Sequence, residues 1–150
     1  MKLHLYHREN DVLAGYTNVW MGVENARQKL DELVDDAEVT ELVANNILEY
    51  VPLEHVSDFL AHMLRKLRKN GTIIITGIDA YSVCKDYVEY KLTLEDMNLF
   101  LHGEQQSDTD IKMTTLALHG LANHIEQEFG MKILRKTIED YTYIIEAQRQ

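Results

Sequence analysis

The hydrophobic pattern of the chain opens with a short alternating run. Leu3 and Leu5 alternate with polar neighbours, which is typical of a strand. Residues 15–22, GYTNVWMG, lie between two glycines and predict a second strand. Only about nine residues separate the two strands, fewer than the dozen or more that a crossover between parallel strands usually needs. We therefore expect an abbreviated connection at the N-terminus.

A strand, a helix and another strand are expected in the middle of the chain. Residues 38–51 begin as a buried strand and reach a turn at Asn45 and Asn46, because asparagine tolerates left-handed backbone conformations. Residues 53–71 place apolar side chains at helical spacing and end in an Asn-Gly stop signal. Residues 72–79, TIIITGID, predict a strand covered on both faces. These elements form a βαβ unit with parallel strands.

The last third of the chain predicts two further helices and a hairpin. Thr93 is the expected N-cap of a helix over residues 93–102, with Asp96 at its third position. After a polar loop, residues 113–129 have helical spacing and end at a glycine. Two strands then close the chain, separated only by residues around Asp140, which requires an antiparallel hairpin. The expected fold class is α/β, with a mostly parallel sheet.

Composition narrows the class of protein. The chain has 150 residues, 45% of them hydrophobic and 27% charged, which is typical of one globular domain spanning residues 1–150. No segment reaches the roughly 18 consecutive apolar residues of a membrane span, and the first residues lack a secretory signal pattern. We expect a cytoplasmic protein with no membrane partner. Its only cysteine, Cys84, excludes an internal disulfide and is expected to be a small buried hydrophobe.

Charge argues against nucleic acid as a partner. The formal net charge of −10 repels a phosphate backbone. The basic residues at positions 65–69 cluster at the end of the expected central helix, where cations meet the negative end of the helix dipole. We assign them a structural role.

Candidate reactive side chains are few. His55 and His62 stand seven residues apart on one expected helix, whereas zinc ligands are usually closer, so no metal site is expected. We expect the histidines to be solvated or at helix caps. Glu49 follows a central strand, near where ligands bind in open α/β sheets, and a general-base role is one hypothesis for it. No catalytic residue is assigned.

Five stretches of the chain, followed by the closing hairpin, carry a family resemblance. They are LHLYHR (3–8), GYTNVW (15–20), TELVANNILEY (40–50), RKLRKNG (65–71) and LTLEDMNLFLHG (92–103). In this order they resemble the small class I S-adenosylmethionine-dependent methyltransferases, particularly short forms with a brief loop between the first two strands. The resemblance implies a Rossmann-like sheet, abbreviated at the N-terminus, and S-adenosylmethionine as the cofactor.

The resemblance also places the cofactor site at the ends of the first strands. The positions that match the cofactor contacts of the family are Leu5, Tyr6, His7, Arg8, Trp20, Met21, Asn45 and Asn46. At the position of Glu49 the family resemblance implies a mostly structural role.

Several of these residues depart from the family pattern. Tyr6, His7 and Arg8 replace a glycine-rich turn that lets the backbone approach the cofactor closely. Trp20 replaces the acid that accepts hydrogen bonds from the ribose hydroxyls, and Tyr50 replaces a histidine. Two lost contacts of about 1.5 to 3 kcal/mol each weaken cofactor binding by roughly a hundredfold or more. The expected site is a degenerate cofactor cradle.

Three hypotheses about function follow. In the first, the chain is an active or weakly active methyltransferase for a small molecule or sugar. In the second, it is a non-catalytic binding or regulatory subunit with a protein partner, including a homodimer. In the third hypothesis the reshaped pocket holds another small ligand. Trp20 and Tyr6 either fill the pocket or stack on a flat ligand. Retained binding of the methyl donor would select the first hypothesis.

Overall fold

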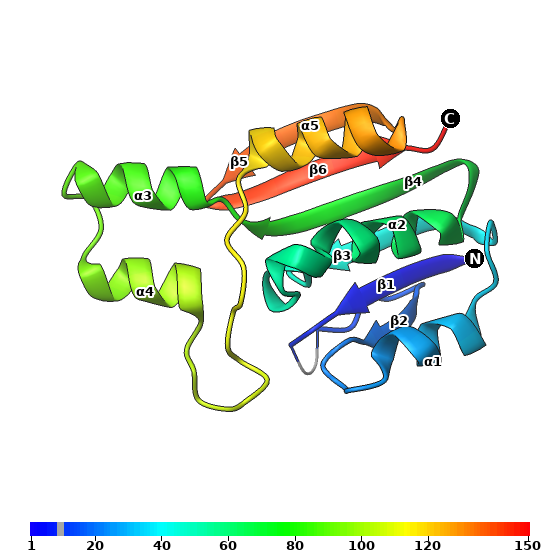
Figure 1. Cartoon of the computed structure of the whole chain (residues 1–150), viewed down its shortest axis with the longest axis horizontal. Coiled ribbons are helices and arrows are strands. Elements are labelled where there is room, and N and C mark those ends of the chain that lie inside the picture. The colour runs from blue at the N-terminus through cyan, green and yellow to red at the C-terminus, as the bar shows by residue number, and fades with distance from the viewer. Residues whose placement is uncertain (9–10) are drawn as a thin grey trace.

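The structure is a computed structural model that describes residues 1–8 and 11–150. Its described residues form one six-stranded sheet, five α-helices and two short 3-10 helices (Figure 1). The strands are β1 (Lys2–Tyr6), β2 (Thr17–Trp20), β3 (Val39–Asn45), β4 (Leu67–Ile78), β5 (Lys132–Glu139) and β6 (Thr142–Gln148). The helices are α1 (Ala26–Leu33), α2 (Val56–Lys66), α3 (Ala80–Val88), α4 (Leu94–His102) and α5 (Leu118–Phe129), with 3-10 turns η1 (Leu48–Tyr50) and η2 (Leu53–His55).

The strand order is β2-β1-β3-β4-β6-β5. The first four strands in this order run parallel, and β6 pairs antiparallel with both β4 and β5. The α/β class and the mostly parallel sheet with a C-terminal hairpin are therefore confirmed. The parallel pair β1 and β2 is joined without a helix in the described residues between them, as the short connection requires.

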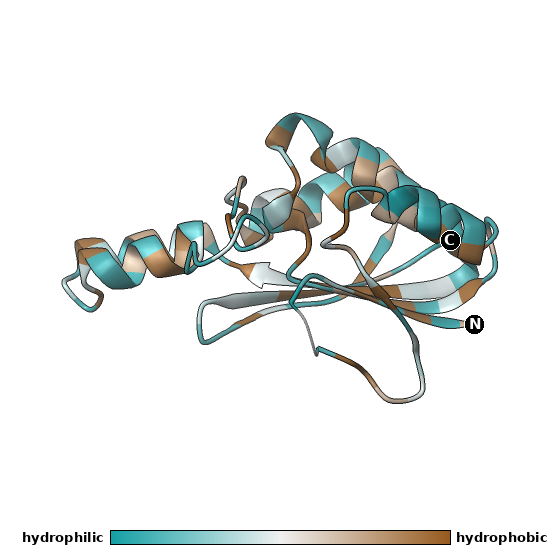
Figure 2. Ribbon diagram, turned by 90° about the horizontal axis from the view of Figure 1, so that it is seen from below, coloured by the Kyte–Doolittle hydropathy of each residue, from teal (hydrophilic) through white to brown (hydrophobic). Residues whose placement is uncertain are grey.

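Helices cover only one face of this sheet. Figure 2 shows α1, α2 and α5 on one side, whereas the described chain places only loops on the other. The burial of β4 alternates accordingly: Ile73 and Ile75 are fully buried, whereas Thr72, Ile74 and Thr76 are half-buried. The expectation that this strand is covered on both faces was wrong. Its β-branched residues reflect strand propensity as much as burial.

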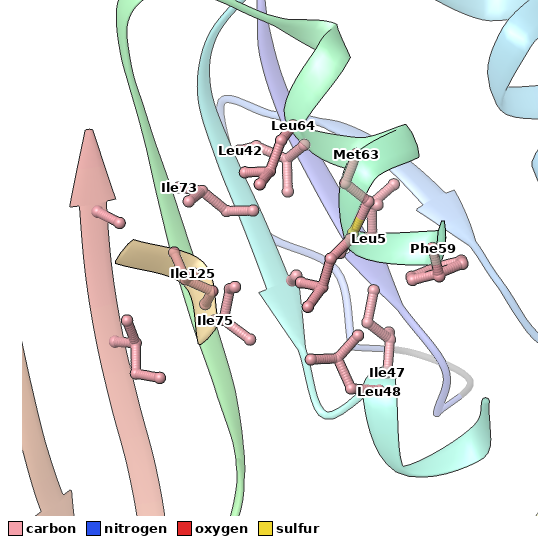
Figure 3. Close-up of a cluster of buried hydrophobic side chains, with 14 of the residues drawn as sticks. Leu5, Leu42, Ile47, Leu48, Phe59, Met63, Leu64, Ile73, Ile75 and Ile125 are labelled. Atoms are coloured by element: carbon pink, nitrogen blue, oxygen red, sulfur yellow. The ribbon is translucent and has the colours of Figure 1, made fainter. Parts of the chain in front are cut away.

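The hydrophobic core lies between the sheet and the three helices. Figure 3 shows Leu5, Leu42, Ile73 and Ile75 of the sheet pointing toward side chains of the helices. Helix α2 contributes most of the helical side of this cluster, with its apolar residues at the spacing that the sequence indicated. Its members from α2 and α5 include Phe59, Leu60, Met63, Leu64, Leu121 and Ile125.

The central helix is shorter than its sequence pattern indicated. Helix α2 ends at Lys66, and Leu67 already pairs with Val39 in the sheet. The pairing then shifts register, and Asn70 takes a φ of 61° in the irregular segment. Leu67 is fully buried at the start of the strand, so its apolar side chain fits the strand as well as it would fit the end of the helix. Asn-Gly therefore marks a bulge within β4 instead of the helix terminus.

Lys66, the last residue of α2, is buried in a cluster of ion pairs. It is 3% exposed, and its Nζ lies 2.7 Å from Asp31 and 3.1 Å from Asp36. Burial opposes its charge, but hydrogen bonds to these carboxylates outweigh burial and raise the pKa of Lys66. Hydrogen bonds from Lys66, and then from His62, lower the pKa of Asp31 to about 2. The buried His62 was expected to be solvated or a cap, and that was wrong.

Two helices were not expected. Helix α1 buries only Ala26 and Leu30, so its apolar pattern is weak. Helix α3 begins after Asp79, whose carboxylate accepts hydrogen bonds from Ser82 N–H of α3 and, at 2.8 Å, from Leu118 N–H of α5. One buried side chain thus caps two helices.

The remaining helices match the sequence in part. Thr93 and Asp96 form both hydrogen bonds of a capping box at the start of α4, which confirms that prediction. Helix α5 ends at Gly130, where φ is 62°, also as expected. It starts five residues later than the pattern suggested, because the backbone N–H groups of Met113 and Thr114 donate to Glu49 O instead. No described helix is long and apolar enough to cross a membrane.

Helices α3 and α4 form a hairpin that projects from the end of the sheet (Figure 1). Its attachment includes a hydrogen bond from the Tyr141 hydroxyl to Asp86 and a contact of the Tyr141 and Phe100 rings at 5.0 Å. Cys84 lies on the exposed side of α3, so the expectation that it is buried was wrong.

Candidate functional site

The crevice between β1 and β3 is the natural ligand position in this topology. From β1 the chain moves to β2 on one side and then to β3 on the other, so the strand order reverses between β1 and β3. In open α/β sheets, ligands bind outside the carboxyl ends of the strands at such a switch point. The residues that follow these strand ends are His7 after β1 and, beyond the turn after β3, Tyr50.

These two side chains close the crevice. The rings of His7 and Tyr50 stack with centroids 3.6 Å apart and planes within 8°. His7 Nε2 is hydrogen-bonded to the carbonyl of Thr109, which requires that this nitrogen carries the proton. Trp20 Nε1–H donates to the carbonyl of His7 at 2.6 Å. Two hydrogen bonds, one to the ring and one to the backbone carbonyl of His7, therefore fix the histidine side of the stack.

The stack separates two surface depressions. The first, about 500 Å³, contains charged groups of both signs from Arg8, Glu104 and Asp110. The second, about 340 Å³, is mainly apolar and contains Met21 and Phe59. His7 lines both, so it forms the wall between them.

Tyr50 is held as a neutral phenol. Burial raises the pKa of its hydroxyl, and the negative charge of Glu49 raises that pKa further. At neutral pH the ring therefore stacks on His7 without a charge of its own.

Glu49 and Lys112 form a buried ion pair behind the stack. Their side chains are 3% and 8% exposed, and Lys112 Nζ lies 2.9 Å from Glu49 Oε2. The other carboxylate oxygen accepts from Ile78 N–H, and Lys112 also donates to Phe100 O at 2.9 Å. A buried charge needs such partners. With both oxygens engaged, Glu49 is placed as a structural anchor for the loop that carries Thr109.

The structure does not bring all eight candidate cofactor residues from the sequence together. His7, Arg8 and Trp20 line the first depression, and Met21 lines the second. Leu5 is buried in the core, and Asn46 occupies the turn with a φ of 49°. The other two, Tyr6 and Asn45, contact His4.

A buried polar network surrounds His4. Its Nδ1 lies 2.7 Å from Asn18 Oδ1 and its Nε2 lies 3.0 Å from Asn45 Nδ2. Tyr6 stacks on the same ring at 5.4 Å. His4 is fully buried, so the expectation of a solvated or capping histidine was wrong here as well. Within residues 1–8 and 11–150, no group of three or more His, Cys, Asp or Glu is arranged to hold a metal ion.

Sequence comparison found no relative. No protein-family model matches the chain, and no curated protein matches it in sequence.

Solved structures do resemble it. A SAM-dependent methyltransferase from Methanosarcina mazei matches with a TM-score of 0.57 and 11% identity, over 89% of this chain and 66% of that one. Another, from Archaeoglobus fulgidus, has a TM-score of 0.55 and 10% identity, over 97% and 74%. A third neighbour is the 1,6-didemethyltoxoflavin-N1-methyltransferase of Burkholderia thailandensis, solved with S-adenosylhomocysteine, with a TM-score of 0.54, 10% identity and coverage of 81% and 48%.

The chain has a class I methyltransferase-like fold. It spans about half the length of the Burkholderia enzyme. At these identities the likeness establishes the fold alone.

Within this methyltransferase-like fold, the sequence patterns did not indicate the residues that contact or support the stack of His7 and Tyr50. Thr109 and Lys112 come from the polar segment before α5, which lacks a motif. The contact of His7 with Thr109 spans 102 residues of chain, so no local pattern could indicate it. Tyr50 was noted as a departure from the family, but its pairing with His7 was not.

Proposed function

We propose that this chain is a methyltransferase-fold protein with a degenerate cofactor site and weak or no methyl transfer, and that its main role is that of a binding or regulatory subunit. The observation that carries the proposal is the stack of His7 on Tyr50 at the switch point. It occupies the position where a cofactor would pass between the ends of β1 and β3. The side chains present do not fit S-adenosylmethionine in this arrangement.

A second observation supports the proposal. One structural neighbour, the Burkholderia enzyme named above, was solved with S-adenosylhomocysteine, so a fold of this kind accommodates that ligand in another sequence. In this chain, the carboxyl end of β2 is Trp20, an aromatic donor whose N–H is already bonded to His7 O. A ribose needs an acceptor for its hydroxyl protons, and an indole N–H supplies none.

Titration calorimetry with S-adenosylmethionine and S-adenosylhomocysteine, each up to about 1 mM, tests this proposal. We expect no binding stronger than about 1 mM, and no incorporation of label from a methyl-labelled donor. A methyltransferase with an intact glycine-rich turn serves as the positive control. Micromolar binding by the wild-type chain would overturn the proposal, because it would require the stack to open readily.

The Tyr50→Ala variant identifies the cause of weak binding. It removes one ring of the stack and leaves Trp20 in place. We expect S-adenosylhomocysteine to bind this variant at least about tenfold more tightly than the wild type. Tyr81→Ala, which removes an exposed tyrosine of α3, is the matched control and leaves the affinity unchanged. Equal affinities for Tyr50→Ala and wild type would show that the stack is not the obstruction.

A further inference from the structure

The second depression beside the stack has the size and the lining of a small-ligand site. Its volume of about 340 Å³ lies at the lower end of the range of such sites, which is about 300 to 1,000 Å³. It lies where the chain between β2 and α1, the turn that contains η1 and the start of α2 converge. Its apolar lining comes from Met21, Val23, Ile47, Val51, Pro52 and Phe59. We call this depression the apolar site.

Aromatic rings form part of the wall of the apolar site. Phe59, which is 5% exposed, lines it from α2, and His7 and Tyr50 line it from the stack. Aromatic side chains pack well against other flat rings, either offset and parallel or edge to face. The lining therefore favours a ligand with a flat aromatic body.

Arg27 of α1 also lines the apolar site, and two neighbours hold its exposed side chain. Its Nε–H donates to Nδ1 of His62 at 3.4 Å, and its guanidinium carbon lies 5.6 Å from the centroid of the Phe59 ring. His62 is buried, and its Nε2 donates to Asp31 Oδ1 at 2.7 Å. Asp31 therefore orients the imidazole, and the imidazole orients Arg27. A side chain positioned in this way loses little freedom when it binds a ligand.

The charge of this guanidinium has no carboxylate partner among residues 1–8 and 11–150. Carboxylates are abundant in the chain, which has 25 Asp and Glu against 15 Lys and Arg. Lys66 and Lys112 both pair with one. Arg27 is held instead by an imidazole and a phenyl ring, and both of its terminal amino groups remain free to donate to a ligand.

We propose that the apolar site binds an organic carboxylate with a flat aromatic body, and that Arg27 pairs with its carboxylate group. A guanidinium matches the two oxygens of a carboxylate and donates two parallel hydrogen bonds to them. The aromatic body then lies against Phe59 and Tyr50. This proposal rests on the proposed function, since the closed stack of His7 and Tyr50 supplies one wall of the site.

Glu24 places the opposite charge at the same site. It is exposed, and no described residue forms a hydrogen bond or an ion pair with its carboxylate, so nothing holds it toward a ligand. We therefore assign recognition to Arg27. Because the two residues differ in sign, their variants have opposite effects on an anionic and a cationic ligand.

Three probes of similar shape but different charge test the proposal by titration calorimetry of the full chain. They are 2-naphthoate, the neutral 2-naphthamide and the cationic 2-naphthylmethylammonium. We expect 2-naphthoate to bind with a Kd of about 1 mM or tighter. It should bind at least about tenfold more tightly than either of the other two probes, because only it can pair with the guanidinium.

Variants of the two charged residues test the partner directly. Arg27→Gln should weaken binding of 2-naphthoate by at least about tenfold and leave binding of 2-naphthamide unchanged. Glu24→Gln should strengthen binding of 2-naphthoate, because it removes a like charge. Lys29→Gln removes another exposed cation of α1 that does not line the apolar site, and as the matched control it leaves the affinity unchanged.

Tyr50→Ala distinguishes this proposal from the proposed function. The variant removes one wall of the apolar site and one ring of the stack. We expect weaker binding of 2-naphthoate together with the tighter binding of S-adenosylhomocysteine described above. Micromolar binding of S-adenosylmethionine by the wild type would overturn the proposed function, whereas absent binding of 2-naphthoate would overturn only the ligand assignment.

Three results would overturn the proposal. No binding of 2-naphthoate to the wild type at about 5 mM would exclude an aromatic carboxylate of this size. An Arg27→Gln variant that binds 2-naphthoate as tightly as the wild type would exclude the guanidinium as its partner. Tightest binding of the ammonium probe, weakened by Glu24→Gln, would identify a cation site.

Discussion

Replacing Lys112 by methionine removes the cation that neutralises the buried carboxylate of Glu49. The carboxylate then stays charged without a partner, which costs about 3 to 5 kcal/mol. Alternatively it takes up a proton, which costs an ordinary glutamate about 4 kcal/mol at pH 7. Both routes predict a similar loss, since Glu49 is only 3% exposed and cannot turn to water without moving the loop.

The assay is urea unfolding at pH 7 and pH 5, followed by the fluorescence of Trp20, the only tryptophan. At pH 7 we expect Lys112→Met to lower the midpoint by about 2 M, with a denaturant slope near 2 kcal/mol/M. At pH 5 the proton costs only about 1 kcal/mol, so the difference from wild type shrinks.

The matched control is the double variant Glu49→Gln/Lys112→Met. Its amide oxygen still accepts from Ile78 N–H, and no charge remains buried. We expect it to be more stable than Lys112→Met alone at pH 7. A loss below about 1 kcal/mol for the single variant, unchanged between the two pH values, would refute the reasoning, because it would mean that water already reaches the ion pair.

Three further predictions concern the rest of the fold. Asp79→Ala removes the cap of two helices and should cost about 2 to 4 kcal/mol, seen as a lower Tm in calorimetry; a loss under 1 kcal/mol would contradict the shared cap. Tyr143→Phe removes a buried hydroxyl that finds no hydrogen-bond partner among the described residues, so stability measured in urea should stay equal or rise, and a clear decrease would indicate a further partner. The pKa of Asp31 is about 2 when folded, below its usual 3.8, so its stabilising contribution is present above pH 4 and is lost as the pH falls through about 2. Thermal melts of wild type and Asp31→Asn should therefore converge at about pH 2, and a constant difference would exclude this role.

Local sequence patterns were sufficient to predict the positions of most strands of the sheet. The alternation around Leu3 and Leu5, the turn at Asn45 and the closing hairpin all place strands where the structure has them. These signals depend on side-chain spacing and turn conformation, which are properties of short segments. The strand-helix-strand pattern of residues 38–79 also indicated the mostly parallel sheet.

The errors arose where tertiary contacts outweighed local preference. The apolar spacing of α2 continues to Leu67, which predicted a longer helix. In the structure Leu67 pairs with Val39 in the sheet, so the helix ends before the Asn-Gly pair. Helix α1 has few apolar residues to detect, and α3 depends on a cap that it shares with a distant helix. At the crevice, the departures at His7 and Trp20 were visible in the sequence, but their joint closure depends on Thr109 and so required the structure.

The one-sided helical layer has a consequence for how this sequence tolerates substitution. Along β4, odd-numbered positions such as Ile73 and Ile75 face the helices, and even-numbered positions such as Ile74 face outward. A systematic survey of all single substitutions should therefore show fitness varying with a period of two along this central strand. In a sheet with helices on both faces, substitutions would be poorly tolerated at every position of this strand. The positions of β4 that tolerate substitution should therefore identify the face of the sheet that no described helix covers.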